Sequence, residues 1–238
     1  GLQTVTWLLE GEILHTDSLN SEAIVRPGGV NVMTAGRGIA HSEETPSPNS
    51  GRLSGVQLWT ALPDHHRDMA PSFTNLEQVP CVEVKGGALQ LFAGTLDGVT
   101  AHAPYFSEIL GAEVQIHPHQ TINLPLQGHL EHAVLLLDGD GALEKQPIEQ
   151  NTLYYLGVSR ESLDISSQSG CKLLLMGGVP FPEKILMWWN FVARTPEEIR
   201  QARDDWEAHR RFGAVIGTHL ERLSAPDLAR FARPNPIS

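Results

Sequence analysis

Positive charge, cysteine and long apolar runs are all scarce in this 238-residue sequence, and each scarcity argues against a class of protein. The 17 Lys and Arg are spread thinly against 28 Asp and Glu, for a formal net charge of −11. Binding to a nucleic acid needs clustered cations that displace counterions from the phosphates. The composition therefore argues against nucleic acid as a direct partner.

The two cysteines and the short apolar runs lead to further exclusions. Cys81 and Cys171 lie in separate segments without the spacing of a metal site, which favours buried thiols over a disulfide and fits a cytoplasmic protein. The longest apolar stretches, such as residues 134–137, have the length of a strand and not of a membrane span. We therefore expect neither a membrane segment nor a membrane partner.

Short β-branched and aromatic stretches, separated by turns, make up most of the chain. Sixteen prolines and 22 glycines supply the turn conformations between them. Many short strands of this kind are typical of a barrel or sandwich, so the sequence predicts an all-β fold. Hairpin turns are expected at Glu10-Gly11 and at Asp138-Gly139-Asp140-Gly141.

The most informative stretch is PGGVNVMTAGRGIAHSE, residues 27–43. Its two glycine-containing turns enclose a short apolar strand, and the chain then resumes as Ile39-Ala40-His41-Ser42-Glu43. If this piece is extended, His41 and Glu43 point to the same face, because side chains alternate along a strand. An imidazole beside a carboxylate is half of a 2-His-1-carboxylate type of metal site.

This stretch, with TVTWLLEGEILHTDS before it and GVQLWTALP after it, resembles the N-terminal cupin of the pirin family. The resemblance implies a bicupin, two β-barrel (jelly-roll) domains with a mononuclear metal in the first. It also implies that His41 and Glu43 are metal ligands and that Glu43 doubles as the candidate catalytic residue. The family's other two ligands form an H-P-H motif, which the resemblance places upstream of Gly1. We therefore expect this chain to carry half of the metal site.

The same resemblance predicts the domain organisation. Residues 1–80 are expected to form the metal-bearing N-terminal cupin without its first strands. Residues 81–238 are expected to form the C-terminal cupin, followed by a helix and an extended tail that pack back on the first barrel. Thr195-Pro196-Glu197-Glu198 predicts the helix start, with Thr195 as its cap and Glu198 completing a capping box, and Gly213 predicts its end. The tail is expected over residues 223–238.

Three other polar or aromatic residues fall near the predicted site. His15 shares a strand face with Ile13; approach to the site is one interpretation, and a hydrogen-bonded strand histidine is the one we prefer. Gln57 and Trp59 share a face of the next strand of the first barrel. Substrate contact is one interpretation of this pair, and barrel packing by Trp59 beside a hydrogen-bonded Gln57 is the one we prefer.

The second barrel contains histidines that imitate a metal site. His117-Pro118-His119 repeats the H-P-H string, but it falls at a turn where proline interrupts the strand, and no His-x-Glu follows at a suitable distance. His129 and His132 are three residues apart, a spacing that splays them on a strand. We predict that the second barrel holds no metal.

The resemblance implies two functional classes, and the residues alone leave both open. One is quercetin 2,3-dioxygenase activity, the O₂-dependent opening of a flavonol ring, with a small aromatic substrate and Fe(II) as the expected metal, Ni, Cu or Mn being alternatives. Glu43 would serve as a ligand or as the base that takes the flavonol proton. The other is a non-enzymatic, iron-dependent regulatory protein that binds protein partners. A metal-free structural bicupin ranks last.

Overall fold

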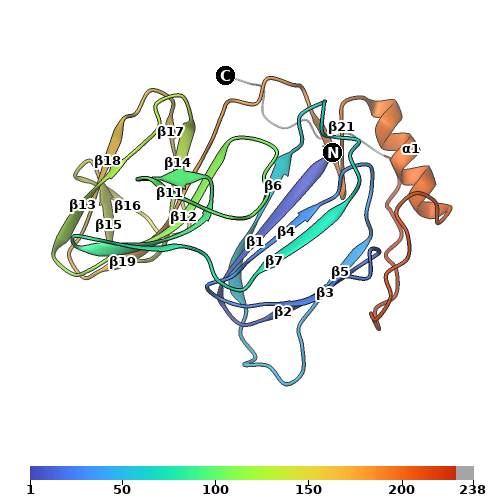
Figure 1. Ribbon diagram of the computed structural model, residues 1–238, viewed down its shortest axis with the longest axis horizontal. Helices are drawn as coiled ribbons and strands as arrows, with labels where there is room; N and C mark the ends of the chain where they lie inside the picture. Colours follow the sequence, from blue (N-terminus) through green and yellow to red (C-terminus); the bar gives the residue numbers. More distant parts are fainter. Residues whose placement is uncertain (229–238) are drawn as a thin grey trace. The chain divides into compact units, whose positions relative to one another are not determined.

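The regular secondary structure of residues 1–228, which the computed structural model describes, consists of β-strands and one helix (Figure 1). They form two compact units. The first unit comprises Gly1–Glu77 together with the chain from Pro182 onward, and the second comprises Gln78–Phe181. Within residues 1–228, no helix is long and apolar enough to cross a membrane. The predicted all-β class is confirmed.

The first unit contains two antiparallel sheets. One sheet has, in spatial order, β6 (Ser54–Ala61), β1 (Leu2–Glu10), β4 (Val30–Thr34) and β7 (Ser72–Leu76). The other has β3 (Glu22–Val25), β2 (Ile13–Asp17) and β5 (His41–Glu44). Figure 1 shows them in blue and cyan as two layers. The stretch singled out in the sequence therefore supplies one strand to each sheet, β4 and β5.

The second unit repeats this arrangement with longer sheets. Its six-stranded sheet has β17 (Leu153–Gly157), β14 (Glu131–Gly139), β19 (Cys171–Gly178), β12 (Ile109–Ile116), β9 (Gly87–Ala93) and β8 (Cys81–Val84). Its four-stranded sheet has β13 (Gln120–Pro125), β18 (Ser162–Ser167), β15 (Gly141–Leu143) and β16 (Gln146–Ile148). A small hairpin joins β10 (Thr95–Leu96) to β11 (Val99–Thr100). Buried leucine, isoleucine and valine side chains from both sheets form one core.

The two predicted hairpins are wrong, for the same reason. At Glu10-Gly11 and at Asp138–Gly141 the chain crosses from one sheet of its unit to the other, so β1 does not pair with β2, nor β14 with β15. Gly139 has a φ of +80°, and a Cβ there would overlap the carbonyl oxygen of Gly170. The Asp140 carboxylate accepts hydrogen bonds from the Ser169 hydroxyl and from the backbone N–H groups of Ser169 and Gln168, which hold its pKa well below the usual range.

The single helix of the described chain, α1 (Pro196–Glu207), begins where the sequence predicts. The Thr195 hydroxyl accepts from the Glu198 N–H at 3.2 Å, but the Glu198 side chain does not complete a capping box. It accepts instead from the Arg194 N–H and pairs with Arg67, and the Arg67 hydrogen bond lowers the Glu198 pKa to about 2. The predicted end at Gly213 is wrong, because α1 stops at Glu207.

Beneath α1 lies a cluster of aromatic side chains from the first unit. The short strands β20 (Leu186–Trp188) and β21 (Phe191–Ala193) bury Trp188 and Phe191 against Ile199 of the helix. The Phe191 and Phe212 rings stack with centroids 5.5 Å apart, and Ala40 belongs to the same cluster. Residues 223–228 of the expected extended tail adopt neither helix nor strand, and residues 229–238 lie outside the described part of the chain.

The two cysteines differ in environment. Cys171 is buried in the core of the second unit, as predicted, whereas Cys81 is exposed on the edge strand β8. Both are free thiols. The prediction of a buried thiol is therefore wrong for Cys81, because an edge strand leaves one of its faces uncovered.

The burial of His132 predicts an acid-sensitive second unit. His132 is 1% exposed and shares the core-facing side of β14 with Val134. Burial lowers the pKa of its imidazole, and the nearby Arg160 and His129 lower it further. The unfolded chain binds the proton more readily, so stability is lost as pH falls from about 6.5 towards the lower folded pKa. We expect the melting temperature of His132→Leu to fall less over this window than that of the wild type. An equally steep fall would contradict this assignment, and the exposed His102→Gln serves as control.

Candidate metal centre

The turn before β5 fixes where His41 emerges. Gly36 has a φ of +50°, and a Cβ there would overlap the carbonyl oxygen of Met69. The Ala40 N–H donates to the Phe212 carbonyl at 3.0 Å, and the Ala40 carbonyl accepts from the Ser18 N–H at 2.8 Å. The residue before His41 is therefore held by backbone hydrogen bonds on both sides and packs in the aromatic cluster.

Strand pairing places four chemically active side chains on one face of the three-stranded sheet. In the β2–β5 register, His15 lies opposite Glu43 and Asp17 lies opposite His41. Residues two apart share a face, so His41 and Glu43 project on the same side, and His15 and Asp17 join them. The HSE sequence of β5 is thus matched by the HTD sequence of β2.

His15 and Asp17 form the buried half of this group. The His15 ring is 2% exposed and stacks on Phe73 with centroids 4.1 Å apart; the centroid of the His41 ring is 5.7 Å away. Nε2 of His15 lies 3.3 Å from Oδ2 of Asp17, whose Oδ1 accepts from the Leu19 and Ser21 N–H groups. His15 is a hydrogen-bonded strand histidine, as preferred from the sequence, and it also approaches the site.

Glu43 is exposed, and its carboxylate is held by an amide of the facing sheet. Nε2 of Gln57 lies 2.9 Å from Oε1 and 3.0 Å from Oε2 of Glu43, and 3.1 Å from the Thr6 hydroxyl. Glu44 points elsewhere, towards the hydroxyls of Ser42 and Thr218. The hydrogen-bonded Gln57 preferred from the sequence is confirmed, whereas Trp59 is 40% exposed and is not fully packed in the barrel.

The protonation state of His41 suits a metal ligand. Part of the ring is open to solvent, yet the surrounding protein displaces enough water for desolvation to lower its pKa. Glu43 opposes this shift, and His15 adds to it. The imidazole is therefore neutral at pH 7, the form in which histidine coordinates metals.

The donors present fit a mononuclear metal as two of its ligands. One neutral imidazole nitrogen and one carboxylate, both solvent-accessible, form the mixed N/O set that iron, nickel, copper and manganese accept. The Asp17 carboxylate is already occupied by backbone N–H groups and His15. Among residues 1–228, no group of three or more His, Cys, Asp and Glu side chains is arranged to hold an ion.

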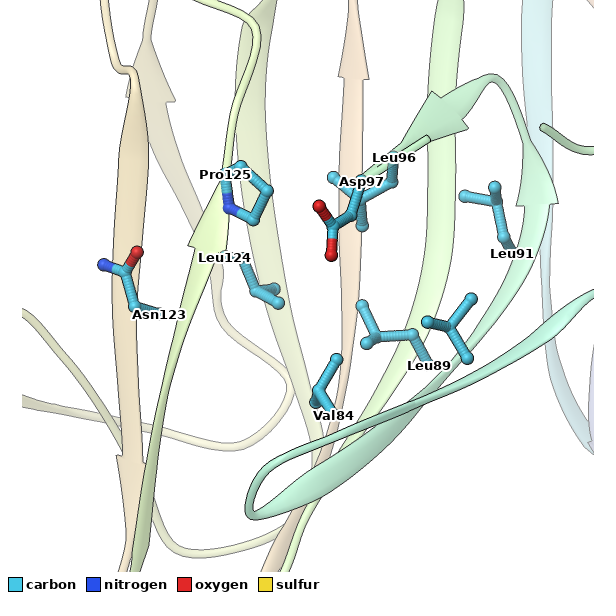
Figure 2. Close-up of a pocket in the computed structure, with 9 residues that line it drawn as sticks. Val84, Leu89, Leu91, Leu96, Asp97, Asn123, Leu124 and Pro125 are labelled. Carbon is cyan, nitrogen blue, oxygen red and sulfur yellow. The ribbon is translucent and has the colours of Figure 1, made fainter. Parts of the chain in front are cut away.

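The histidines of the second unit do not form a cluster that could hold a metal ion. His119 sits in a turn at a φ of +60°, with Nδ1 3.4 Å from the Gln168 side chain, and His129 pairs with Glu108 at 2.7 Å. The hollow between the sheets of this unit is lined by aliphatic side chains, with the Asp97 carboxylate among them (Figure 2). Its volume of about 30 Å³ is that of a water-sized space and contains no imidazole.

We therefore predict that replacing His117 and His119 together by alanine leaves the metal content of the protein unchanged. Both side chains are exposed and neither lies in the His41 sheet. Metal content is measured by elemental analysis of the purified variant beside the wild type. A halved content would show that the second unit binds metal and would overturn the prediction.

Sequence reasoning missed two supporting residues, Asp17 and Phe73. A signal for Asp17 was present, because His15 and Asp17 alternate in the same way as His41 and Glu43. Phe73 lies on β7, which pairs with β4 and not with β2, so its stack on His15 joins two sheets. Only the packing of the two sheets reveals that contact.

Comparisons with known proteins bear on the family and the fold of the chain. A family model described as Pirin matches residues 1–60, and one described as the Pirin C-terminal cupin domain matches residues 111–213. The chain is 42% identical, over 96% of its length and 72% of the relative's, to a Pseudomonas aeruginosa protein named "Putative quercetin 2,3-dioxygenase PA1205".

Two solved structures extend the comparison. A quercetin 2,3-dioxygenase from Acinetobacter baumannii superposes with a TM-score of 0.93 at 35% identity, covering 98% of this chain and 78% of that one. The bacterial pirin YhhW from Escherichia coli, solved in complex with nickel(II), has a TM-score of 0.61 at 18% identity, covering 76% of this chain and 73% of that one. The YhhW likeness shows the fold alone.

Proposed function

The chain belongs to the pirin family of bicupins, and we propose that it is a metal-dependent dioxygenase of the quercetin 2,3-dioxygenase type. The observation that carries the proposal is the pairing of His41 and Glu43 on one face of β5, with the Glu43 carboxylate held by Gln57. This face presents one neutral nitrogen donor and one anionic oxygen donor to solvent.

The proposed roles follow from these environments. His41 offers a neutral imidazole, and the stacked His15 and the Asp17 carboxylate restrict the space that its ring can occupy. Glu43 offers a carboxylate whose hydrogen-bond partner, Gln57, is a neutral amide that does not cancel its charge. When bound, a redox-capable metal would supply O₂ activation and polarise the substrate oxygen. We propose Fe(II) as that metal, with Ni, Cu or Mn as alternatives.

A flat aromatic substrate is the class that the neighbouring residues support. Trp59 shares the Gln57 face of β6 and leaves 40% of its surface exposed. An exposed indole provides a stacking surface for an aromatic ring. The amide oxygen of the exposed Gln57 adds a hydrogen-bond acceptor on the same face, which can accept from a hydroxyl of a flavonol.

The test is metal analysis of the purified full-length protein, followed by an assay of flavonol consumption under O₂. We expect bound metal, and flavonol ring opening with release of carbon monoxide. Protein that carries metal and leaves the flavonol unchanged would exclude the dioxygenase and favour the iron-dependent regulatory alternative. Protein that takes up no metal would exclude both.

A further inference from the structure

Gln57 lies where it can control the orientation of Glu43. It belongs to β6, and its backbone position is set by the β1–β6 ladder, in which it faces Thr6. Its amide nitrogen is within hydrogen-bond distance of both Glu43 oxygens, at 2.9 and 3.0 Å, and of the Thr6 hydroxyl at 3.1 Å. Only the nitrogen end of the amide can face a carboxylate, because a carboxylate has no hydrogen to donate.

The chemical nature of this partner matters for the site. An exposed glutamate otherwise samples several rotamers, and ordering its side chain costs about 1.5–2 kcal/mol of conformational entropy. An amide orders the carboxylate without cancelling its charge, whereas lysine or arginine in the same place would compete with a cation. Gln57 thus leaves Glu43 both ordered and fully anionic.

We infer that Gln57 is the positioning residue for Glu43: its amide nitrogen holds the carboxylate through both oxygens, so that the lone pairs not used by the amide face the metal, and Thr6 anchors the amide. The inference rests on the proposed function for the presence of the metal, but not for the hydrogen bonds themselves. It assigns Glu43 the role of a fixed ligand and not of a mobile base, because swinging away would break its contacts with Gln57.

The first test needs no metal. The side-chain NH₂ signals of Gln57 are identified by ¹⁵N NMR as those lost in Gln57→Leu. We expect these signals to shift in Glu43→Gln and in Thr6→Val, whereas those of Gln115, an exposed glutamine on β12, do not move. If the chemical shifts of the Gln57 signals change in neither variant, the inference is overturned, whatever the protein's activity.

The second test measures the Co(II) affinity and the Co(II) absorption spectrum of the purified full-length protein. We expect Gln57→Leu to weaken Co(II) binding by about 10–100-fold, the usual effect of removing a group that orients a metal ligand, and to alter the spectrum. Thr6→Val, which keeps the buried side-chain volume, should change both in the same direction but less. Gln115→Leu, the matched control, should change neither.

A double-mutant cycle separates positioning from a general structural effect. If Gln57 acts through Glu43, Gln57→Leu should have little further effect on Co(II) affinity in the Glu43→Gln background. A loss of equal size in both backgrounds, or an unchanged affinity and spectrum in Gln57→Leu alone, would overturn the inference. Absence of Co(II) binding in the wild type, with the NMR shifts present, would refute the proposed metal function and leave the Gln57–Glu43 contact established.

Discussion

His41→Ala is expected to reduce bound metal in the full-length protein from about one equivalent to background, since a mononuclear site depends on each of its few protein ligands. The exposed ring lies at the start of β5 and takes no part in the buried clusters, so its loss should cost the fold little. Metal content by elemental analysis, beside a thermal melt, separates loss of a ligand from loss of the fold.

Two companion variants make this result specific. Glu43→Ala should lower metal content as well, because it removes the oxygen donor and leaves only the imidazole. His65→Ala, an exposed histidine in the turn after β6, should leave the content unchanged. Undiminished metal in a folded His41→Ala protein would contradict the site assignment and, with it, the proposed dioxygenase.

The candidate pair could be found from sequence because strand alternation is a local property. His41-Ser42-Glu43 follows a glycine turn and must point two donors to one side if it is extended. The matches to the two pirin family models confirm the family. The likeness to a solved quercetin 2,3-dioxygenase confirms the two-cupin, all-β fold. The pairing of β5 with β2, which brings His15 and Asp17 beside the site, depends on contacts between distant segments that periodicity does not encode.

The wrong predictions share the same cause. Asp138-Gly139-Asp140-Gly141 has the composition of a hairpin, but the composition of a turn does not say whether the chain returns along the same sheet or crosses to the facing one. Glu198 has the position of a capping-box residue, yet its carboxylate pairs with Arg67, 131 positions away in the chain. A charge-assisted pair with arginine is stronger than a hydrogen bond to one backbone N–H. Tertiary contacts override local signals in both cases.

Gly111→Ala is expected to destabilise the second unit strongly. Gly111 begins a register shift between β12 and β9, and it lies against the ring of Phe92, which is fully buried. A Cβ at Gly111 would overlap Cε2 of Phe92 and approach Cδ2 and Cζ to 2.8 Å. The ring has little room to move, because Phe92 is fully buried and its backbone carbonyl accepts from the Tyr105 hydroxyl. Overpacking of this kind costs about 1–3 kcal/mol, and a ring held on all sides favours the upper end.

Thermal or urea unfolding measures this loss, and two further variants establish its cause. Gly178→Ala, where a Cβ meets Ile109 at an ordinary 3.4 Å, should change the free energy of unfolding by less than about 0.5 kcal/mol. Phe92→Leu should make Gly111→Ala less costly, because the smaller side chain leaves room for the added methyl. Because Gly111 lies in the second unit, Gln78–Phe181, whereas His41 and Glu43 lie in the first, folded Gly111→Ala protein should also keep wild-type Co(II) affinity. If the losses in the free energy of unfolding from Gly111→Ala and Phe92→Leu are additive in the double variant, the new Cβ does not overlap the Phe92 ring.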